Sequence, residues 1–178
     1  AAMQVIVADD ESTDETLALA AIVAESDDRV TVFTVPPRPV DKAWRGKNWA
    51  CMQAAKRATG EYLLFVDTDV RLEPWAIARS LANAQTYHTD LLSCAPRIIC
   101  GCFAEWLIQP IMAMLIAVGF SFEGVNDPEQ LDKTAAAGPF MLFHRAAYEK
   151  IGTHAAVATD TVEDFALARL IKANGLTL

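Results

Sequence analysis

Cysteine is scarce in this sequence, and its spacing matches no metal-binding pattern. Cys51, Cys94, Cys100 and Cys102 include no C-x-x-C pair and no Cys/His spacing typical of zinc. Cys51 falls in an expected helix and Cys94 in an expected strand, so we expect both thiols in the core. We expect Cys100 and Cys102 in an ordinary reduced loop. Free thiols are typical of a reducing compartment, so we expect a cytoplasmic protein, with the cytoplasmic face of a membrane as the alternative.

An excess of positive charge is also lacking. The sequence has 15 Lys and Arg against 23 Asp and Glu, a net charge of −8. Binding to nucleic acid requires a basic face for the phosphates, so this balance argues against a nucleic-acid partner. The phosphate-binding loop G-x-x-x-x-G-K-[ST] is absent as well. An acidic chain suits a nucleotide site only if a metal ion supplies the positive charge.

No hydrophobic run is long enough to span a bilayer. Residues 103–122 are mostly apolar, but Glu105, Gln109 and Pro110 interrupt them. The remaining run, residues 111–120, is shorter than the roughly 20 residues that a spanning helix needs. Three alternatives remain for this segment: a buried helix, an interfacial helix in contact with a membrane surface, or a wall of an apolar acceptor pocket.

Two apolar segments each end in a pair of acidic residues. The pairs are Asp67 and Asp69 after residues 61–66, and Asp9 and Asp10 after residues 4–8. In an extended chain Asp67 and Asp69 lie on the same side, where their charges repel unless a cation is shared between them. Mg²⁺ or Mn²⁺ relieves that repulsion and leaves coordination positions for phosphate oxygens. The alternative is a strand that runs into a solvated acidic turn.

Strand-like and helix-like segments alternate along the chain. Strands are expected at residues 4–8, 30–35, 61–66 and 90–94, and helices at residues 15–25, 46–58, 74–88 and 165–172. This alternation is typical of an α/β fold with a mostly parallel central sheet flanked by helices. Ligands of such sheets bind outside the carboxyl ends of the strands, so we expect the two acidic ends to share one site. The length suits one domain, residues 1–178.

Five motifs, in order, resemble those of the family 2 glycosyltransferases. Residues 5–14 are similar to V-V-D-D-G-S-T-D, with Glu11 in place of a glycine at a turn that often wants positive φ. The others are G-K-x-x-A at residues 46–50, D-x-D at 67–69, G-x-x-x-x-x-R-R…G-G at 138–152, and E-D at 163–164. Each is short, but together they cover nearly the whole chain. Trp106, Pro110 and residues 125–128 and 152–154 resemble the branch that glycosylates hopanoid, carotenoid or ceramide-type lipids.

The resemblance implies a GT-A (nucleotide-diphospho-sugar transferase) fold and an inverting transfer. A sugar would move from a nucleotide-diphosphate sugar to an acceptor hydroxyl, on a lipid in the branch above. Asp164 would be the general base, and a divalent metal at Asp69 would neutralise the leaving diphosphate. Asp67 would contact the metal or the ribose, and Asp10, with Asp9 as the alternative, would bind the nucleotide base.

Some roles stay open at the level of sequence. Lys47 is either a phosphate contact or a solvated surface lysine, and Glu163 and Asp164 either act in catalysis or only cap a helix. His154 is expected as an ordinary loop histidine, with a metal or acceptor contact as the alternative. The sequence has no signal peptide, and we expect a domain truncated at both ends, with the family's first strand missing. The alternatives to a transferase are a non-catalytic nucleotide-binding fragment of such a domain and a nucleotidyltransferase of similar fold.

Overall fold

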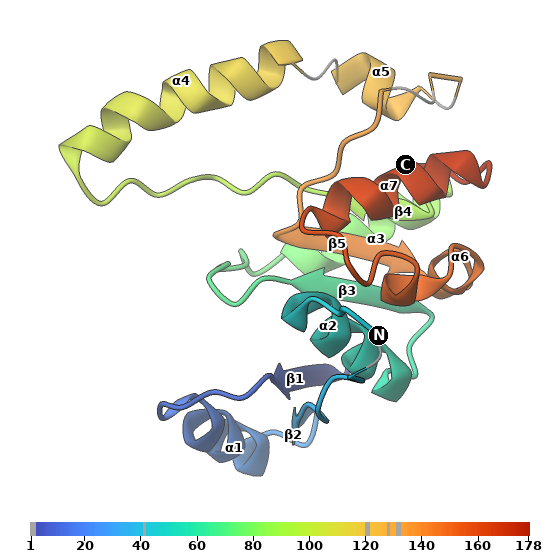
Figure 1. The fold of residues 1–178 in the computed structure, drawn as a ribbon. Helices are drawn as coiled ribbons and strands as arrows, with labels where there is room; N and C mark the ends of the chain where they lie inside the picture. Colours follow the sequence, from blue (N-terminus) through green and yellow to red (C-terminus); the bar gives the residue numbers. More distant parts are fainter. Residues whose placement is uncertain (1–2, 41, 120–121, 128, 131–132) are drawn as a thin grey trace.

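A computed structural model describes residues 3–40, 42–119, 122–127, 129–130 and 133–178 of the chain. Strands and helices alternate through most of these ranges (Figure 1). The strands are β1 (Val5–Asp9), β2 (Val30–Thr34), β3 (Tyr62–Val66), β4 (Leu91–Ser93) and β5 (Phe140–His144). The helices are α1 (Thr16–Ser26), α2 (Gly46–Arg57), α3 (Ala76–Tyr87), α4 (Phe103–Gly119), α5 (Phe122–Asn126), α6 (Arg145–Lys150), the 3₁₀ helix η1 (Thr153–Ala155) and α7 (Glu163–Ala173).

The strands form two hydrogen-bonded ladders. β1 and β2 are parallel, with Val5 opposite Val30. The other ladder has the order β3-β5-β4, and β5 runs antiparallel to both neighbours. The expected α/β fold with its parallel pairing is confirmed, but the described strands do not form one continuous sheet, and an antiparallel strand joins β3 to β4. β1 and β3 end on the same side of the molecule (Figure 1), which places their acidic ends near each other.

The core lies between the β3-β5-β4 ladder and helix α7. The side chains of Leu91, Phe143, Leu167 and Ile171 are fully buried there. Leu167 and Ile171 are four residues apart, so they lie on one face of α7 and pack together against the sheet. Strand β5 is buried on both faces, as a central strand covered by helices should be. This packing fixes the position of α7 and therefore of the acidic residues in its first turn.

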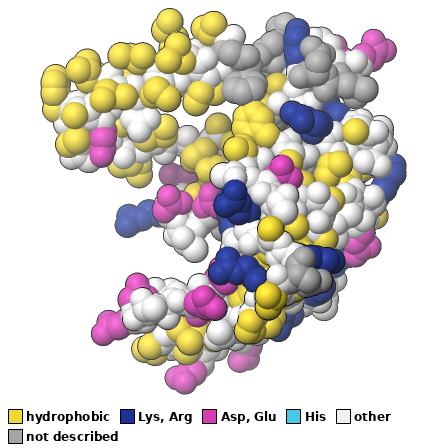
Figure 2. Space-filling model, viewed as in Figure 1, with side chains coloured by type: hydrophobic (Ala, Val, Ile, Leu, Met, Phe, Trp, Pro, Cys, Tyr) yellow, Lys and Arg dark blue, Asp and Glu magenta, His cyan; other side chains and the backbone are white. Residues whose placement is uncertain are grey.

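Helix α4 extends away from the rest of the domain as an arm (Figure 1). Hydrophobic side chains cover it (Figure 2), and ten of them are between 48% and 78% exposed: Phe103, Trp106, Leu107, Ile108, Ile111, Met112, Met114, Leu115, Ile116 and Val118. The buried-helix alternative for this segment is therefore wrong. Within the described part of the chain, no helix has the length and apolar character to cross a membrane.

Two smaller expectations change, and one is supported. Helix α7 begins at Glu163, two residues earlier than expected, so Glu163 and Asp164 belong to its first turn. Cys94 is exposed just after β4 and is not a core thiol, because the strand ends at Ser93. Burial raises the pKa of the Cys51 thiol, on helix α2, to about 12, which agrees with its expected place in the core.

Candidate functional site

The first turn of helix α2 lies against the end of strand β1. A Cβ atom on Gly46 would stand only 2.6 Å from Oδ2 of Asp10 and 3.1 Å from Nη1 of Arg38. The lack of a Cβ atom at Gly46 therefore leaves room for the Asp10 carboxylate beside the helix backbone. The position suits an acidic side chain, since a helix N-terminus carries partial positive charge. Gly46 thus brings Asp10, a predicted nucleotide contact, to the start of α2.

Lys47 joins two further acidic segments at the same helix end. Its Nζ atom lies 2.8 Å from Oδ1 of Asp67, just after β3, and 2.8 Å from Oε1 of Glu163, in the first turn of α7. Partial burial opposes the charge on Lys47, but its hydrogen bonds with Asp67 and Glu163 outweigh this and raise its pKa. Lys47 is therefore not a free surface lysine, and its role as a phosphate contact stays a prediction. It connects the D-x-D and E-D segments.

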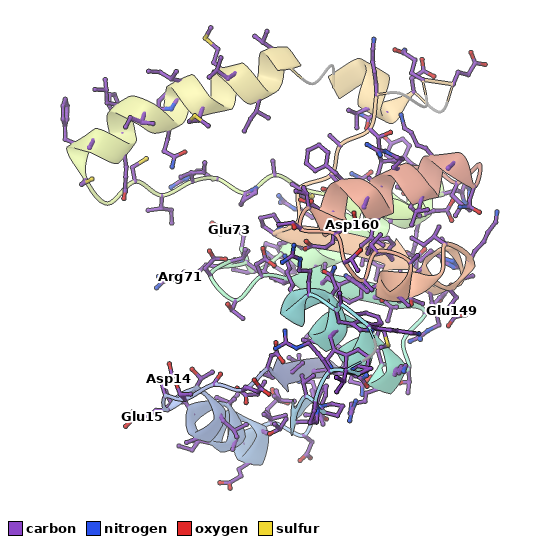
Figure 3. All side chains as sticks on the ribbon, viewed as in Figure 1. Asp14, Glu15, Arg71, Glu73, Glu149 and Asp160 are labelled. Carbon is purple, nitrogen blue, oxygen red and sulfur yellow. The ribbon has the colours of Figure 1, made fainter. Side chains whose placement is uncertain are left out.

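Asn48, the next residue, holds the loop that leads into helix α7. Its side chain is buried, and Nδ2 donates hydrogen bonds to the carbonyl oxygens of Val157 at 2.7 Å and Asp160 at 3.1 Å. The backbone N–H of Arg45 donates to Ala158 O at 2.8 Å, from the same turn of α2. Figure 3 shows Asp160 on the segment that leads into α7. These contacts fix where the E-D residues stand relative to α2.

Asp164 is held by two backbone donors. Its Oδ2 atom accepts from Gly138 N at 2.9 Å, and Oδ1 accepts from Phe165 N at 2.9 Å. A Cβ atom on Gly138 would lie 3.0 Å from Oδ2, so the glycine leaves room for the carboxylate. Each carboxylate oxygen keeps a second lone pair for another donor. Asp164 is thus oriented and still able to accept a proton.

The remaining predicted site residues stand at the two strand ends. Asp9 is buried, and its Oδ1 atom has no hydrogen-bond partner among the described residues. Asp69 is exposed, on the turn that Val70 closes by donating its N–H to Asp67 O at 3.1 Å. Beyond that turn, Arg71 and Glu73 project outward from the loop (Figure 3). Glu11 has a φ of 63°, which confirms the expected positive-φ turn after β1.

A cluster of buried aromatic side chains packs next to strand β3. Tyr148 Oη lies 2.6 Å from Nδ1 of His154, and both side chains are buried. The His154 ring also packs against Phe65 of β3, with ring centroids 4.7 Å apart. Burial, with a smaller contribution from the charge of Lys47, lowers the pKa of His154 to about 4. The prediction of an ordinary loop histidine missed this role in packing.

Comparison with known proteins shows the family of this chain. The family model described as Glycosyl transferase family 2 matches residues 2–152. The chain belongs to this family. It is 31% identical over 167 residues to 4,4'-diaponeurosporenoate glycosyltransferase of Staphylococcus aureus strain MRSA252, and equally to that of strain Newman. The alignments cover 93% of this chain but only 42% of those relatives, so the chain spans about two fifths of their length.

A solved structure agrees on the fold of this family 2 domain. The mannosyltransferase PcManGT of Pyrobaculum calidifontis, in complex with GDP-Man and Mn²⁺, superposes with a TM-score of 0.67 at 20% identity. The match covers 98% of this chain and 44% of the mannosyltransferase. The expected GT-A fold is thereby confirmed.

The carboxylates fit a metal that is shared with a bound donor. Among the described residues, no group of three or more His, Cys, Asp or Glu side chains is placed to hold a metal ion. Mg²⁺ and related ions, however, are commonly bound through one or two carboxylates together with substrate phosphates. Exposed Asp69 and neighbouring Asp67, half-exposed and paired with Lys47, offer that donor set. The residues therefore fit a divalent ion that arrives with a diphosphate.

Sequence reasoning did not predict the partners of three residues that shape the site. Glu163 is buried and paired with Lys47, Asn48 holds the loop before α7, and Gly138 donates to Asp164. All three lie within segments matched to family motifs, but their partners are about 25 to more than 100 positions away.

Two surface hollows, of about 220 and 490 Å³, lie elsewhere along α2 and share Met52, Lys56 and Thr153. Neither is lined by the site carboxylates, and the chemistry described above favours the strand ends over these hollows.

Proposed function

We propose that this family 2 domain transfers a sugar from a nucleotide-diphosphate sugar to an acceptor hydroxyl, with inversion at the anomeric carbon. One observation carries the proposal: consecutive residues of α2, Gly46 and Lys47, contact Asp10, Asp67 and Glu163. Three acidic segments far apart in the sequence therefore surround one helix end. A diphosphate, its metal, a nucleotide base and a reacting hydroxyl require such a gathering of acidic side chains.

Asp164 is proposed as the general base. The acceptor oxygen forms a bond to the anomeric carbon from the face opposite the leaving group. The bond from that carbon to the diphosphate oxygen breaks, its electron pair stays on the nucleoside diphosphate, and the acceptor proton passes to an Asp164 carboxylate oxygen. The hydrogen bonds from Gly138 and Phe165 support this role, because they fix the carboxylate before the acceptor arrives.

The donor end of the reaction is proposed for the ends of β1 and β3. Asp69, with Asp67, would hold Mg²⁺ or Mn²⁺, and the ion when bound would neutralise charge on the leaving diphosphate. Asp10, with Asp9 as the alternative, would accept a hydrogen bond from the nucleotide base. The mannosyltransferase of the solved structure is in complex with GDP-Man and Mn²⁺, which supports a metal-dependent nucleotide-sugar donor for this chain.

The experiment compares three variants of the full protein that contains this domain. Asp69→Asn should reduce the Mn²⁺-dependent rise in melting temperature on addition of GDP or UDP, because one metal ligand is lost. Asp164→Asn should keep that rise and lose transfer by about a hundredfold or more, the usual contribution of a general base. Asp28→Asn, an exposed site between α1 and β2, is the matched control and should change neither.

The two active-site variants separate the proposed roles. Equal loss of nucleotide binding and transfer in Asp164→Asn would contradict the assignment of the base. Nucleotide binding that does not depend on metal, or does not change in Asp69→Asn, would contradict the metal site. Metal-dependent binding without turnover in the unmodified protein would favour a non-catalytic nucleotide-binding domain.

We further propose that the acceptor is a lipid and that α4 contacts a membrane, at the cytoplasmic face. The arm exposes ten apolar side chains, and between residues 106 and 118 it has no charged residue. A helix that is apolar all round is normally covered by protein or by lipid. The name of the Staphylococcus aureus relatives, 4,4'-diaponeurosporenoate glycosyltransferase, also supports an apolar acceptor.

Liposome flotation tests the membrane contact. Glutamate at both Ile111 and Leu115 should release the protein from liposomes, because a charge placed in the apolar layer is costly. The matched control places glutamate at Leu19 and Ile22, which are similarly exposed on α1, and should leave flotation unchanged. Flotation that survives the α4 changes, in protein that still melts cooperatively, would contradict the proposal.

A further inference from the structure

Lys172 is a buried lysine that the proposed chemistry does not use. It lies in the last turn of α7 and is only 4% exposed. Its Nζ atom is within hydrogen-bond distance of four backbone carbonyl oxygens: those of Gly124 at 3.0 Å, Asp127 at 2.9 Å, Gln130 at 3.1 Å and Lys133 at 2.8 Å. Four described residues between positions 124 and 133 therefore direct their carbonyl oxygens to one ammonium group.

The burial of a lysine side chain at this position requires a physical explanation. Burying an ammonium group is costly unless hydrogen bonds replace its water. Three N–H donors here serve four carbonyl oxygens, so every donor has a partner and one is shared. A compact point charge suits such a ring of oxygens, whereas a planar guanidinium does not. The position near a helix C-terminus also favours a positive charge.

The loop that Lys172 holds connects two parts of the proposed site. At one end, Gly124 belongs to α5, which follows the apolar α4 arm (Figure 1). At the other end, the chain continues from Lys133 to Gly138, whose N–H donates to Asp164. Asp164 and Lys172 are eight residues apart on α7, or about 12 Å along the helix. Helix α7 therefore holds this chain segment at two points.

The carboxylate of Asp127 closes the same loop internally. Its Oδ1 atom accepts from Glu129 N at 2.9 Å, and Oδ2 accepts from Gln130 Nε2 at 2.7 Å. Those hydrogen bonds, first that of the Gln130 side chain, lower the pKa of Asp127, with a smaller contribution from the charge of Lys172. The loop is thus shaped to present its carbonyl oxygens to Lys172.

We propose that Lys172 is a positioning residue, which fixes the base of the α4–α5 arm at a set distance from Asp164. The inference deepens the proposed function and rests on it, since the arm is the proposed acceptor side. Lys172 touches neither donor nor acceptor. It acts by holding the loop, and so sets where an acceptor carried by the arm meets the general base.

Hydrogen exchange tests the placement without requiring turnover. In Lys172→Met, which keeps the length of the side chain but has no donor, the hydrogen-bonded amides of Glu129, Gln130 and Lys133 should exchange about tenfold faster or more. Amides of β5 should be unchanged. The control is Lys150→Met, since the exposed Lys150 donates to a single carbonyl among the described residues, Asn174 O at 3.0 Å. This control should leave the exchange of the loop unchanged.

Kinetics of the full protein give the second readout. Lys172→Met should raise the KM for the acceptor about tenfold, while the metal-dependent affinity for the nucleotide stays as in the unmodified protein. If the variant fails to fold, exchange in the unmodified protein decides: the loop amides should be as protected as those of α7. Loop amides that exchange within seconds would overturn the proposal.

The outcomes distinguish this inference from the proposed function. Unchanged loop exchange in Lys172→Met overturns the inference, whatever the activity. Equal loosening of the loop and of β5 also overturns it, because that would be a general loss of stability. Faster loop exchange with unchanged KM for the acceptor would refute the positioning role. If the unmodified protein transfers no sugar but the hydrogen exchange of the loop is as expected, this contradicts the proposed function and not the inference about Lys172.

Discussion

Acid should destabilise this domain through His154. The imidazole is 2% exposed, and its Nδ1 atom lies 2.6 Å from Tyr148 Oη. That oxygen also accepts the backbone N–H of His154 at 3.2 Å, so we assign the hydroxyl proton to the bond with Nδ1. Protonation of Nδ1 would remove this acceptor and place a charge in the aromatic cluster. The folded state therefore favours the neutral ring.

The size of the effect follows from the lowered pKa. Burial lowers the pKa of His154 from 6.5 to about 4 in the folded state, and the unfolded chain keeps the ordinary value. Each tenfold change in proton affinity corresponds to about 1.4 kcal/mol, so the full effect on the free energy of unfolding is about 3 kcal/mol. Above pH 6.5 this stability is fully present. It is lost as the pH falls from 6.5 to about 4, and about 2 kcal/mol is lost by pH 5.

Urea unfolding at pH 7 and pH 5 measures this loss. His154→Asn keeps a polar atom near the position of Nδ1 but does not titrate, so its stability should fall by about 2 kcal/mol less than that of the unmodified protein over this range. His88→Asn removes an exposed histidine at the end of α3, where φ is 51° and asparagine is tolerated. This control should lose as much stability as the unmodified protein. If His154→Asn also loses as much stability as the unmodified protein, the interpretation of His154 as a buried, neutral histidine is refuted.

Three further predictions concern the residues around the site. Glu11→Gly should raise the free energy of unfolding by up to about 1 kcal/mol, because glycine adopts the φ of 63° without strain; a lower melting temperature would contradict this. Gly138→Ala should reduce transfer while nucleotide binding is kept, since its Cβ would lie 3.0 Å from Oδ2 of Asp164; full activity would show that the carboxylate can move freely. A double-mutant cycle of Lys47→Met and Glu163→Gln in urea should give a coupling of about 1 kcal/mol, and additive effects would contradict the ion pair.

Local sequence signals predicted most of the secondary structure. The strand expected at residues 30–35 is Val30–Thr34, and the helix expected at residues 46–58 is Gly46–Arg57. The turn expected to want positive φ has it at Glu11. These features depend on neighbours in sequence, through side-chain periodicity and backbone preference. That is why a single sequence contains enough information to place them.

Features that depend on distant parts of the chain were not predicted. Strand β5 is apolar except for His144 at its end, and such a strand has the same pattern whether it pairs in parallel or antiparallel. Helix α4 has the composition of a core helix, and only the tertiary structure shows its exposed side chains. Lys172 also has the sequence pattern of an ordinary lysine near a helix end, and its four carbonyl partners lie 39 to 48 positions earlier.

The same holds for the candidate site, where the sequence predicted which residues belong to it but not which residues they contact. The acidic motifs identified Asp10, Asp67 and Asp164 as a set, but not what brings their segments together. In the structure, consecutive residues of α2 bring these segments together. Gly46 leaves room for Asp10, and Lys47 pairs with Asp67 and Glu163. Asn48 adds the loop before α7. Successive residues on a helix are rotated by about 100°, so Gly46, Lys47 and Asn48 face different directions and lie against different segments. A shift of this one helix end would therefore separate the residues proposed to hold the donor, the metal and the acceptor proton, and these contacts constrain the spacing of the G-K-N sequence as well as its charge.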